Sequence, residues 1–280
     1  MPNKECIKSP EDIDWAYFWA KKLEEKKDRK KDWDKAAASF HKRNQRDDYQ
    51  IALLNQIKLK PNDTVLDIGC GEGSITIPIS KKVKSITGLD SSKEMLKLLN
   101  KRASDENISN INTVLEDIEE IKYEEIGDYD IVIASRSLNG IIPIKEILNE
   151  INKIANKYVF ITLFGPNNWL IEKEFQEYLG NETKEFPSYL YLMHILDDLG
   201  ICANIERLEI EEYRKYASIE DAMDNGKFRI DLLNDKEIEK LKIYLKEILT
   251  KDENTGEFYN KRDKADWMLR YRMIRAHTFP

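Results

Sequence analysis

The chain has 280 residues, of which 41% are hydrophobic and 10% aromatic, so it can bury the core of one large globular domain or of one domain with an appended cap. Its formal net charge of −7 disfavours a general nucleic-acid-binding or anionic-membrane surface. Cys6, Cys70 and Cys202 are far apart in the sequence, which argues against a disulfide framework and against a zinc or iron–sulfur site. The N-terminus lacks a signal-peptide pattern and no apolar run approaches a membrane span, so we expect a cytoplasmic protein without a membrane partner.

Residues 1–50 predict a helical N-terminal extension. Ser9 and Pro10 form a helix start, and the helix that follows carries aromatic side chains on two sides. A helix of this kind has neighbours on both sides, so it either packs against the domain or forms a lid over a substrate cleft. Further along the extension, His41 lies in a short basic stretch and is a candidate general base by residue type.

The most informative stretch is Thr64–Ser74, with the sequence TVLDIGCGEGS. A short apolar strand reaches Asp67, and glycines follow at every second position, at Gly69, Gly71 and Gly73. Glycines are used where backbone N–H groups approach a small ligand, because a Cβ atom would hold the ligand away. The pattern D-x-G-x-G-x-G differs from the dinucleotide fingerprint G-x-G-x-x-G. It indicates a ligand-binding turn between a strand and a helix of an α/β fold.

Further strands and helices alternate after this turn. A helix is expected over 73–82, and another begins at a capping box, Ser91–Glu94. The later strands are expected at 84–90, which ends in Asp90, at 111–115, which precedes Glu116, Asp117 and Ile118, at 129–135, which ends in Ser135, and at 157–164.

In this order and at this spacing, the segments resemble the motifs of the class I S-adenosylmethionine-dependent methyltransferases. The resemblance implies an α/β fold with a Rossmann-like, doubly wound, mostly parallel seven-stranded sheet and helices on both faces. The sixth strand is expected at 204–213, and an antiparallel seventh at 267–279. The methyltransferase domain would span 51–280, with helical insertions at about 166–200 and 217–262 that form a helical cap together with the N-terminal extension.

The same resemblance implies a set of cofactor-binding residues. The turn glycines, with Cys70 between them, would lie under the methionine and ribose parts of S-adenosylmethionine. Asp67 would face the methionine ammonium through water, and Asp90, followed by Ser91, would bind the ribose diol. S-adenosylhomocysteine would be the product.

The third and fourth strands complete this set. Asp117 would bind the adenine amine and Ile118 would pack on the ring, although Glu116 or Glu119 could replace Asp117 if the third strand is shifted. Ser135 would place its backbone near the methionine part.

Residues for the methyl acceptor are less well defined. The sequence after the fourth strand, 135–139, is not the Asn/Asp-Pro-Pro-aromatic signature of enzymes that methylate bases or glutamine amides. Arg136 could bind a carboxylate or phosphate, or form a structural salt bridge. His194 is a second candidate general base, although its helix has a strong apolar face and favours a packing role. Three aromatic side chains could line the acceptor pocket or pack in the core: Tyr49, Trp169 and Tyr189.

These observations predict methyl transfer to a small-molecule acceptor. Alignment of the acceptor with the activated methyl group supplies most of the rate in such a reaction, and neither a metal nor a covalent residue is expected. An RNA methyltransferase and a non-catalytic S-adenosylmethionine-binding subunit remain alternatives. The glycine spacing argues against a nicotinamide-dependent oxidoreductase. The sequence does not define the acceptor, the methylated atom or the oligomeric state.

Overall fold

The structure is a computed structural model, and it describes residues 12–25, 32–35, 37, 48–165, 170–183, 186–210, 215–225, 228, 233–260 and 264–272. The chain divides into two compact units, each of which gathers segments that are distant in the sequence. The first unit holds Met1–Phe164, Phe186–Leu208 and Asp266–Pro280, and the second holds Gly165–Glu185 and Glu209–Ala265.

A seven-stranded sheet forms the centre of the first unit, in the order β3-β2-β1-β4-β5-β10-β6. The pairings of β1 with β2 and β4, of β2 with β3, and of β4 with β5 are parallel, whereas β10 runs antiparallel to β5. The strands are β1 (Thr64–Ile68), β2 (Ser85–Asp90), β3 (Ile111–Leu115), β4 (Tyr129–Ser135), β5 (Ala155–Phe164), β6 (Asn204–Ile210) and β10 (Lys264–Arg272). This order confirms the predicted doubly wound sheet with one antiparallel strand.

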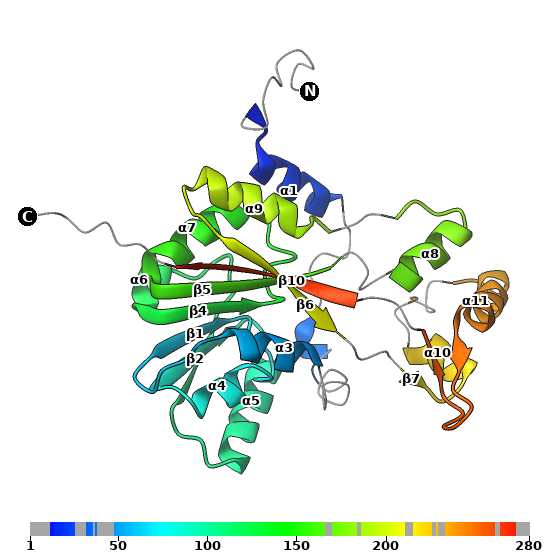
Figure 1. Cartoon of the computed structure of the whole chain (residues 1–280), viewed down its shortest axis with the longest axis horizontal. Coiled ribbons are helices and arrows are strands. Elements are labelled where there is room, and N and C mark those ends of the chain that lie inside the picture. The colour runs from blue at the N-terminus through cyan, green and yellow to red at the C-terminus, as the bar shows by residue number, and fades with distance from the viewer. Residues whose placement is uncertain are drawn as a thin grey trace, which may run out of the picture. The chain divides into compact units, whose positions relative to one another are not determined.

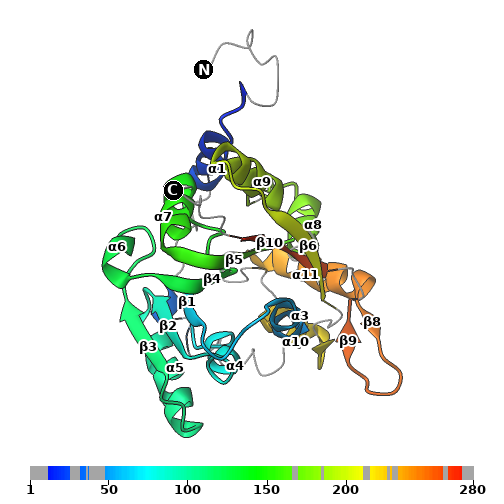
Figure 2. The same ribbon diagram turned by 60° about the vertical axis from the view of Figure 1, so that its left-hand side comes forward.

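Helices cover both faces of this sheet (Figures 1 and 2). One face carries α3 (Asp48–Gln56), α4 (Thr76–Ser80) and α5 (Lys93–Asp105). The other carries α6 (Tyr123–Ile126), α7 (Ile144–Ile154) and α9 (Tyr189–Asp198), with α1 (Trp15–Glu24) against α7 and α9. Parallel strands enclosed in this way need apolar side chains on both faces, which is why β1, β4 and β5 read as nearly continuous apolar runs.

Helix α7 shows how the sequence pattern fixes the packing. Its five buried side chains are spaced three or four residues apart and form one stripe toward the sheet: Ile144, Ile147, Leu148, Ile151 and Ile154. They belong to the largest core cluster of the first unit, together with side chains of the central strands. The position of the loop that joins β4 to α7 is therefore set at both of its ends by buried elements.

The N-terminal helix α1 is a packing element in this structure. Trp19 and Leu23 are fully buried in the same core cluster, and the Trp19 indole N–H donates to the backbone carbonyl of Ile141 at 2.6 Å. Asp14 caps the helix by accepting from the Tyr17 backbone N–H at 2.9 Å. The predicted helix start at Ser9 and Pro10 lies outside the described residues.

At the amino ends of the central strands, one lysine bridges two acids. Lys157 Nζ contacts Asp63 Oδ1 at 2.6 Å and Asp130 Oδ1 at 3.1 Å. Asp63 is almost fully buried, and Asp130 also accepts from the Thr64 backbone N–H at 3.0 Å. The contacts raise the pKa of Lys157, first through its hydrogen bond to Asp63. This arrangement ties β1, β4 and β5 together at the edge opposite the glycine turn.

The second unit has its own small core. It contains α8 (Leu170–Tyr178), α10 (Ile219–Asn225), α11 (Asp235–Ile248) and a three-stranded sheet in the order β7-β9-β8. The strands are β7 (Lys215–Tyr216), β8 (Thr250–Lys251) and β9 (Phe258–Tyr259). The core is rich in aromatic rings, with Phe175 edge-to-face against Phe228 at 5.7 Å and tilted against Tyr244 at 5.5 Å.

Several predicted boundaries differ from the structure. The predicted insertion at 166–200 included α9, which belongs to the first unit because its apolar face packs against α1 and α7. The second predicted insertion, at 217–262, is not purely helical, since the short strands β8 and β9 lie within it. Helix α4 is shorter than the predicted 73–82, and β10 begins before residue 267, while residues 273–280 lie outside the described part of the chain.

Candidate active site

The glycine turn after β1 has a backbone that other residues adopt only with strain. Gly69, Gly71 and Gly73 all have positive φ, of 70°, 54° and 85°. A Cβ on Gly69 would collide with the Cβ of Ser137, and one on Gly73 would collide with a methyl group of Leu99. A Cβ on Gly71 would meet no atom within 4 Å. Two glycines are therefore needed for packing, while the middle one leaves open space beside the turn.

Asp90, at the end of β2, holds this turn in place. Its carboxylate accepts from the Gly71 backbone N–H at 2.8 Å and from the Ser92 backbone N–H at 2.8 Å. Burial raises the pKa of Asp90, and the two backbone hydrogen bonds oppose that shift. Each carboxylate oxygen has a further lone pair, so the group can accept from a ribose hydroxyl without losing the turn.

Asp67, at the end of the buried part of β1, is the most strongly perturbed acid of the site. Thr76 Oγ1 donates to its Oδ2 at 2.6 Å, and its Oδ1 has no hydrogen-bond partner although the residue is 1% exposed. Burial raises its pKa to about 7, and the negative charge of Asp90 adds to the shift. A buried carboxylate with an unpartnered oxygen suits a cationic ligand group, so the residues present fit the ammonium of S-adenosylmethionine.

The loop after β3 joins the same edge of the sheet. The Glu116 backbone N–H donates to the Asp90 carbonyl at 3.2 Å, and Asp117 Oδ1 accepts from the Glu119 backbone N–H at 2.9 Å. Ile118 packs against the main core, and its carbonyl accepts from the Tyr123 hydroxyl at 3.2 Å. The structure thus brings the ends of β1, β2 and β3 together as the motif order predicted.

Sequence reasoning missed one acid near this site. Asp34 Oδ1 accepts from Ser92 Oγ at 2.6 Å and from the Glu94 backbone N–H at 3.1 Å. The N-cap of α5 is Ser92, one residue later than the predicted capping box required, and the backbone N–H of Ser92 donates to Asp90 rather than to a Glu of the helix. No local pattern in the sequence signalled the contact between Asp34 and Ser92.

The ends of β4 and β5 present a chain of hydroxyl groups on the α3 side of the site. The Tyr49 hydroxyl lies 2.6 Å from Ser135 Oγ and 2.5 Å from Thr162 Oγ1, and Tyr49 itself is 3% exposed. Arg136, which follows Ser135, has a φ of 57°. Its guanidinium carbon lies 3.5 Å from the centre of the Tyr49 ring. The sequence proposed these three residues separately, and the structure brings them together.

Other candidate residues have packing roles. His194 stacks on Trp15 of α1, with ring centres 4.2 Å apart, and Tyr189 stacks on Trp267 of β10 at 4.1 Å. Neither is brought to the glycine turn. His41 and Trp169 lie outside the described residues. Cys70 is buried, and Gly88 is packed so closely to it that a Cβ there would lie 2.8 Å from its Sγ.

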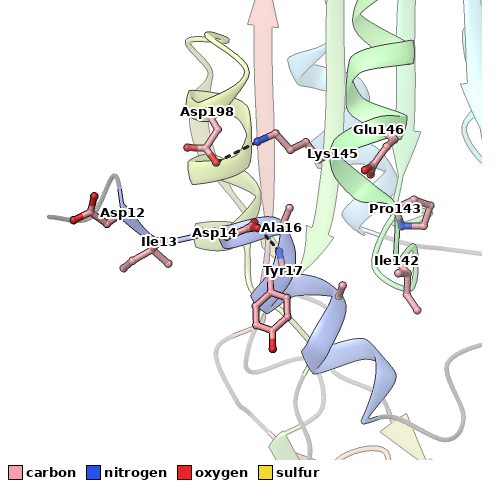
Figure 3. Close-up of a pocket in the computed structure, with 11 residues that line it drawn as sticks. Asp12, Ile13, Asp14, Ala16, Tyr17, Ile142, Pro143, Lys145, Glu146 and Asp198 are labelled. Atoms are coloured by element: carbon pink, nitrogen blue, oxygen red, sulfur yellow. Dashed lines mark hydrogen bonds and ion pairs between the residues drawn. The ribbon is translucent and has the colours of Figure 1, made fainter. Parts of the chain in front are cut away.

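A separate cavity of about 730 Å³ lies between α1, the start of α7 and the end of α9 (Figure 3). Its polar rim includes Asp14, Lys145 and Asp198, and Lys145 Nζ lies 3.6 Å from Asp198 Oδ2. None of its lining residues belongs to the glycine turn or to the loops after β2 and β3. It is therefore distinct from the candidate cofactor site.

The described residues contain no cluster of three or more His, Cys, Asp or Glu side chains placed to hold a metal ion. Within the same residues, no helix is both long and apolar enough to cross a membrane.

Comparison with known proteins agrees with the site. The family description "methyltransferase domain" matches residues 59–200, just over half of the chain. The chain therefore belongs to this family, and it is an S-adenosylmethionine-dependent methyltransferase.

Individual relatives cover more of the chain. An uncharacterized protein of Haemophilus influenzae is 29% identical over 197 residues, which are 70% of this chain and 72% of that protein. The putative methyltransferase 235L of Invertebrate iridescent virus 6 is 28% identical over 70% of this chain and 77% of its own length. The crystal structure of YcgJ from Bacillus subtilis superposes with a TM-score of 0.55 at 12% identity, over 81% of this chain and 99% of that one, and shows the same fold.

Shorter matches have named acceptors. A demethylmenaquinone methyltransferase of Lactobacillus johnsonii is 27% identical over 50% of this chain and 59% of its own length. A mitochondrial ribosomal RNA small subunit methyltransferase of Arabidopsis thaliana is 23% identical over 46% of this chain and 31% of its own length.

Proposed function

We propose that the protein transfers the methyl group of S-adenosylmethionine to a small-molecule acceptor that binds beside the loop after β4. The assignment of the cofactor rests on the glycine turn. Asp90 holds this turn through a hydrogen bond, and one carboxylate oxygen of the buried Asp67 has no hydrogen-bond partner. In this proposal Asp90, with Ser91 beside it, binds the ribose diol, Asp117 and Ile118 bind the adenine, and Asp67 holds the ammonium through water.

The sulfonium of S-adenosylmethionine supplies a methyl group that is already activated for in-line displacement. The chain then has to orient the acceptor and exclude water. Ser135 and Tyr49 are placed to orient it, because their hydroxyls are fixed by each other at the end of β4, the strand next to β1 in the sheet. Methyl transfer of this kind requires no covalent intermediate on a side chain.

Three features support a small acceptor. The residues after β4 lack the Asn/Asp-Pro-Pro-aromatic signature, the net charge is −7, and Tyr49 and Arg136 are stacked where an acceptor would bind. The demethylmenaquinone relative is consistent with this proposal. Because another relative is a ribosomal RNA methyltransferase, RNA is the second candidate for the methyl acceptor.

Calorimetric titration with S-adenosylmethionine, S-adenosylhomocysteine and NADH tests whether the glycine turn binds the proposed cofactor. We expect micromolar binding of both adenosyl ligands and none of NADH. Absence of adenosyl binding would contradict the assignment of the glycine turn.

The acceptor class has its own test. The protein is incubated with S-adenosylmethionine labelled at the methyl group, and with either the dialysable metabolites or the purified RNA of a cell extract. We expect label in the dialysable fraction, and less of it with Asp90→Ala at a subsaturating concentration of S-adenosylmethionine. Label that appears in RNA instead would replace the small-molecule proposal by the RNA one.

A further inference from the structure

The peptide unit between Ile141 and Ile142, in the loop that joins β4 to α7, is held by side chains of two distant segments. Its carbonyl, from Ile141, accepts from the indole N–H of Trp19 in α1 at 2.6 Å. Its N–H, from Ile142, donates to Oε1 of Glu119 in the loop after β3 at 3.4 Å. The carbonyl and N–H of a planar trans peptide point in opposite directions, so Trp19 and Glu119 hold the same unit from opposite sides.

The other two backbone groups of these residues have local partners. The Ile141 N–H donates to the Leu138 carbonyl at 3.2 Å, and the Ile142 carbonyl accepts from the Ile144 N–H at 2.7 Å. All four backbone polar groups of the two residues are therefore satisfied, two by the loop itself and two by distant side chains. The conformation of this loop depends on α1 and on the loop after β3 as much as on its own turn.

Glu119 is also bonded to the acid that the proposed function assigns to adenine. Its backbone N–H donates to Asp117 Oδ1 at 2.9 Å. The Asp117 carbonyl accepts from the N–H groups of Glu120 and Ile121, at 3.0 and 2.9 Å, so residues 117–121 form one compact turn. Ile121 packs against the core cluster that contains Trp19. The direction of the Asp117 carboxylate is thus tied to the position of Glu119.

From these contacts we propose that Glu119 is a positioning residue for adenine recognition. Its side chain is anchored on the peptide unit that Trp19 fixes, and its backbone N–H directs the Asp117 carboxylate toward the adenine amine. Asp117 can accept from the amine as well, because a carboxylate accepts several hydrogen bonds at once. The proposal rests on the proposed function and deepens it, since it makes helix α1 a determinant of selectivity for adenine over other purines.

An analogue of the product isolates this selectivity. S-inosylhomocysteine carries a carbonyl oxygen where S-adenosylhomocysteine carries the adenine amine, and the two ligands are compared by calorimetric titration. We expect the wild-type protein to bind S-adenosylhomocysteine at least about tenfold more tightly, because a carboxylate accepts from an amine but repels a carbonyl oxygen. Asp117→Ala should bind both ligands almost equally, which sets the scale for the other variants.

Substitutions of Glu119 test whether it acts through Asp117. Glu119→Ala removes the acceptor of the Ile142 N–H but keeps the backbone bond to Asp117, and the preference for S-adenosylhomocysteine should fall at least about threefold. Glu119→Gln keeps an oxygen that can accept from Ile142 and should retain most of the preference. The matched control is Glu120→Ala, which removes an exposed acid of the same turn and should leave the preference unchanged.

A substitution in α1 tests the other side of the peptide unit. Trp19→Phe removes the donor to the Ile141 carbonyl and should lower the preference as Glu119→Ala does. The effects of the two substitutions on the preference should be less than additive in the double variant, because both act on one peptide unit. If Trp19→Phe does not fold, Glu119→Ala decides alone.

The possible failures are distinguishable. If the wild-type protein does not bind S-adenosylhomocysteine, the proposed function fails and this proposal fails with it. If it binds both ligands equally, the assignment of Asp117 to adenine is wrong and the present proposal falls, while the cofactor class stands. If the wild type prefers S-adenosylhomocysteine but Glu119→Ala keeps the full preference, or weakens both ligands by the same factor, only the present proposal is overturned.

Discussion

The indole N–H of Trp19 donates a 2.6 Å hydrogen bond to the backbone carbonyl of Ile141, which lies 122 residues later in the loop between β4 and α7. Trp19 is fully buried, so this bond and the ring together join the N-terminal helix to the loop that begins with Arg136. Helix α1 is thus a structural part of the first unit.

Two substitutions of Trp19 should destabilise the protein to different extents. Trp19→Phe leaves the Ile141 carbonyl without its donor and should cost about 1–2 kcal/mol, whereas Trp19→Ala also leaves a cavity and should cost about 3–5 kcal/mol. Urea unfolding measures both. Tyr17→Phe, on the exposed side of the same helix, should change the free energy of unfolding by less than about 0.5 kcal/mol. Equal effects of Trp19→Phe and Tyr17→Phe would show that the buried bond contributes nothing.

Asp90 should control cofactor affinity. Asp90→Ala removes the acceptor for Gly71 and Ser92 as well as the proposed ribose contact, so S-adenosylmethionine binding should weaken by about 1–3 kcal/mol. Calorimetry measures the change. The matched variant is Asp105→Ala, at the far end of α5, which should bind as wild type does. Unchanged affinity in Asp90→Ala would mean that the end of β2 does not hold the ribose.

Asp67 should make both stability and binding depend on pH. Its folded pKa of about 7 lies above its ordinary value of 3.8, so the folded protein binds more protons than the unfolded chain between these limits. The stability of the ligand-free protein should therefore fall as pH rises from about 4 to 7. Asp67→Asn should remove this slope from urea unfolding experiments.

Cofactor binding should respond to the same group in the opposite direction. An ammonium favours the ionised carboxylate, so affinity for S-adenosylmethionine should rise from pH 5.5 to 7.5, by up to about tenfold per unit below the pKa. Calorimetry at several pH values measures the slope, and the Asp67→Asn variant should lack it. A flat profile in the wild type would argue that the cation is held elsewhere.

The lysine bridge at the opposite edge of the sheet should stabilise the fold without affecting the site. Lys157→Met leaves the buried Asp63 carboxylate without its cation, and the loss should be about 1–2 kcal/mol. A larger loss is not expected, because the lysine side chain is 43% exposed and water screens the pair. Lys97→Met removes a surface pair with Glu94 and is the control, with an expected change below about 0.5 kcal/mol in urea unfolding.

The sequence predicted the elements that carry the cofactor motifs. The strands 111–115 and 129–135 have the predicted bounds, and the acids at the ends of β1 and β2 lie beside the glycine turn. These elements were predictable because buried parallel strands are continuous apolar runs, and because the polar residues that follow them gather at one edge of the sheet.

What the sequence did not reveal depends on distant contacts. Asp34 reaches Ser92 across 58 residues, and Trp19 reaches Ile141 across 122, so no local pattern marks either. A distant contact also favours Ser92 over Ser91 as the N-cap of α5. Both serines are suitable caps, but Asp34 binds only Ser92. Strands β7, β8 and β9 are two residues each, too short to show an alternating pattern.

The register of β5 and β10 bears on how far the inserted segments of the second unit could vary in length. Phe164, the last residue of the first unit before the chain leaves it, is the register partner of Asp266, the residue at which the chain returns for the last time. Exit and re-entry are therefore held side by side by ladder hydrogen bonds of the main sheet. The second unit is inserted between strands that the main sheet already pairs, so we expect that insertions of other lengths could occupy the same place while the cofactor edge stays unchanged.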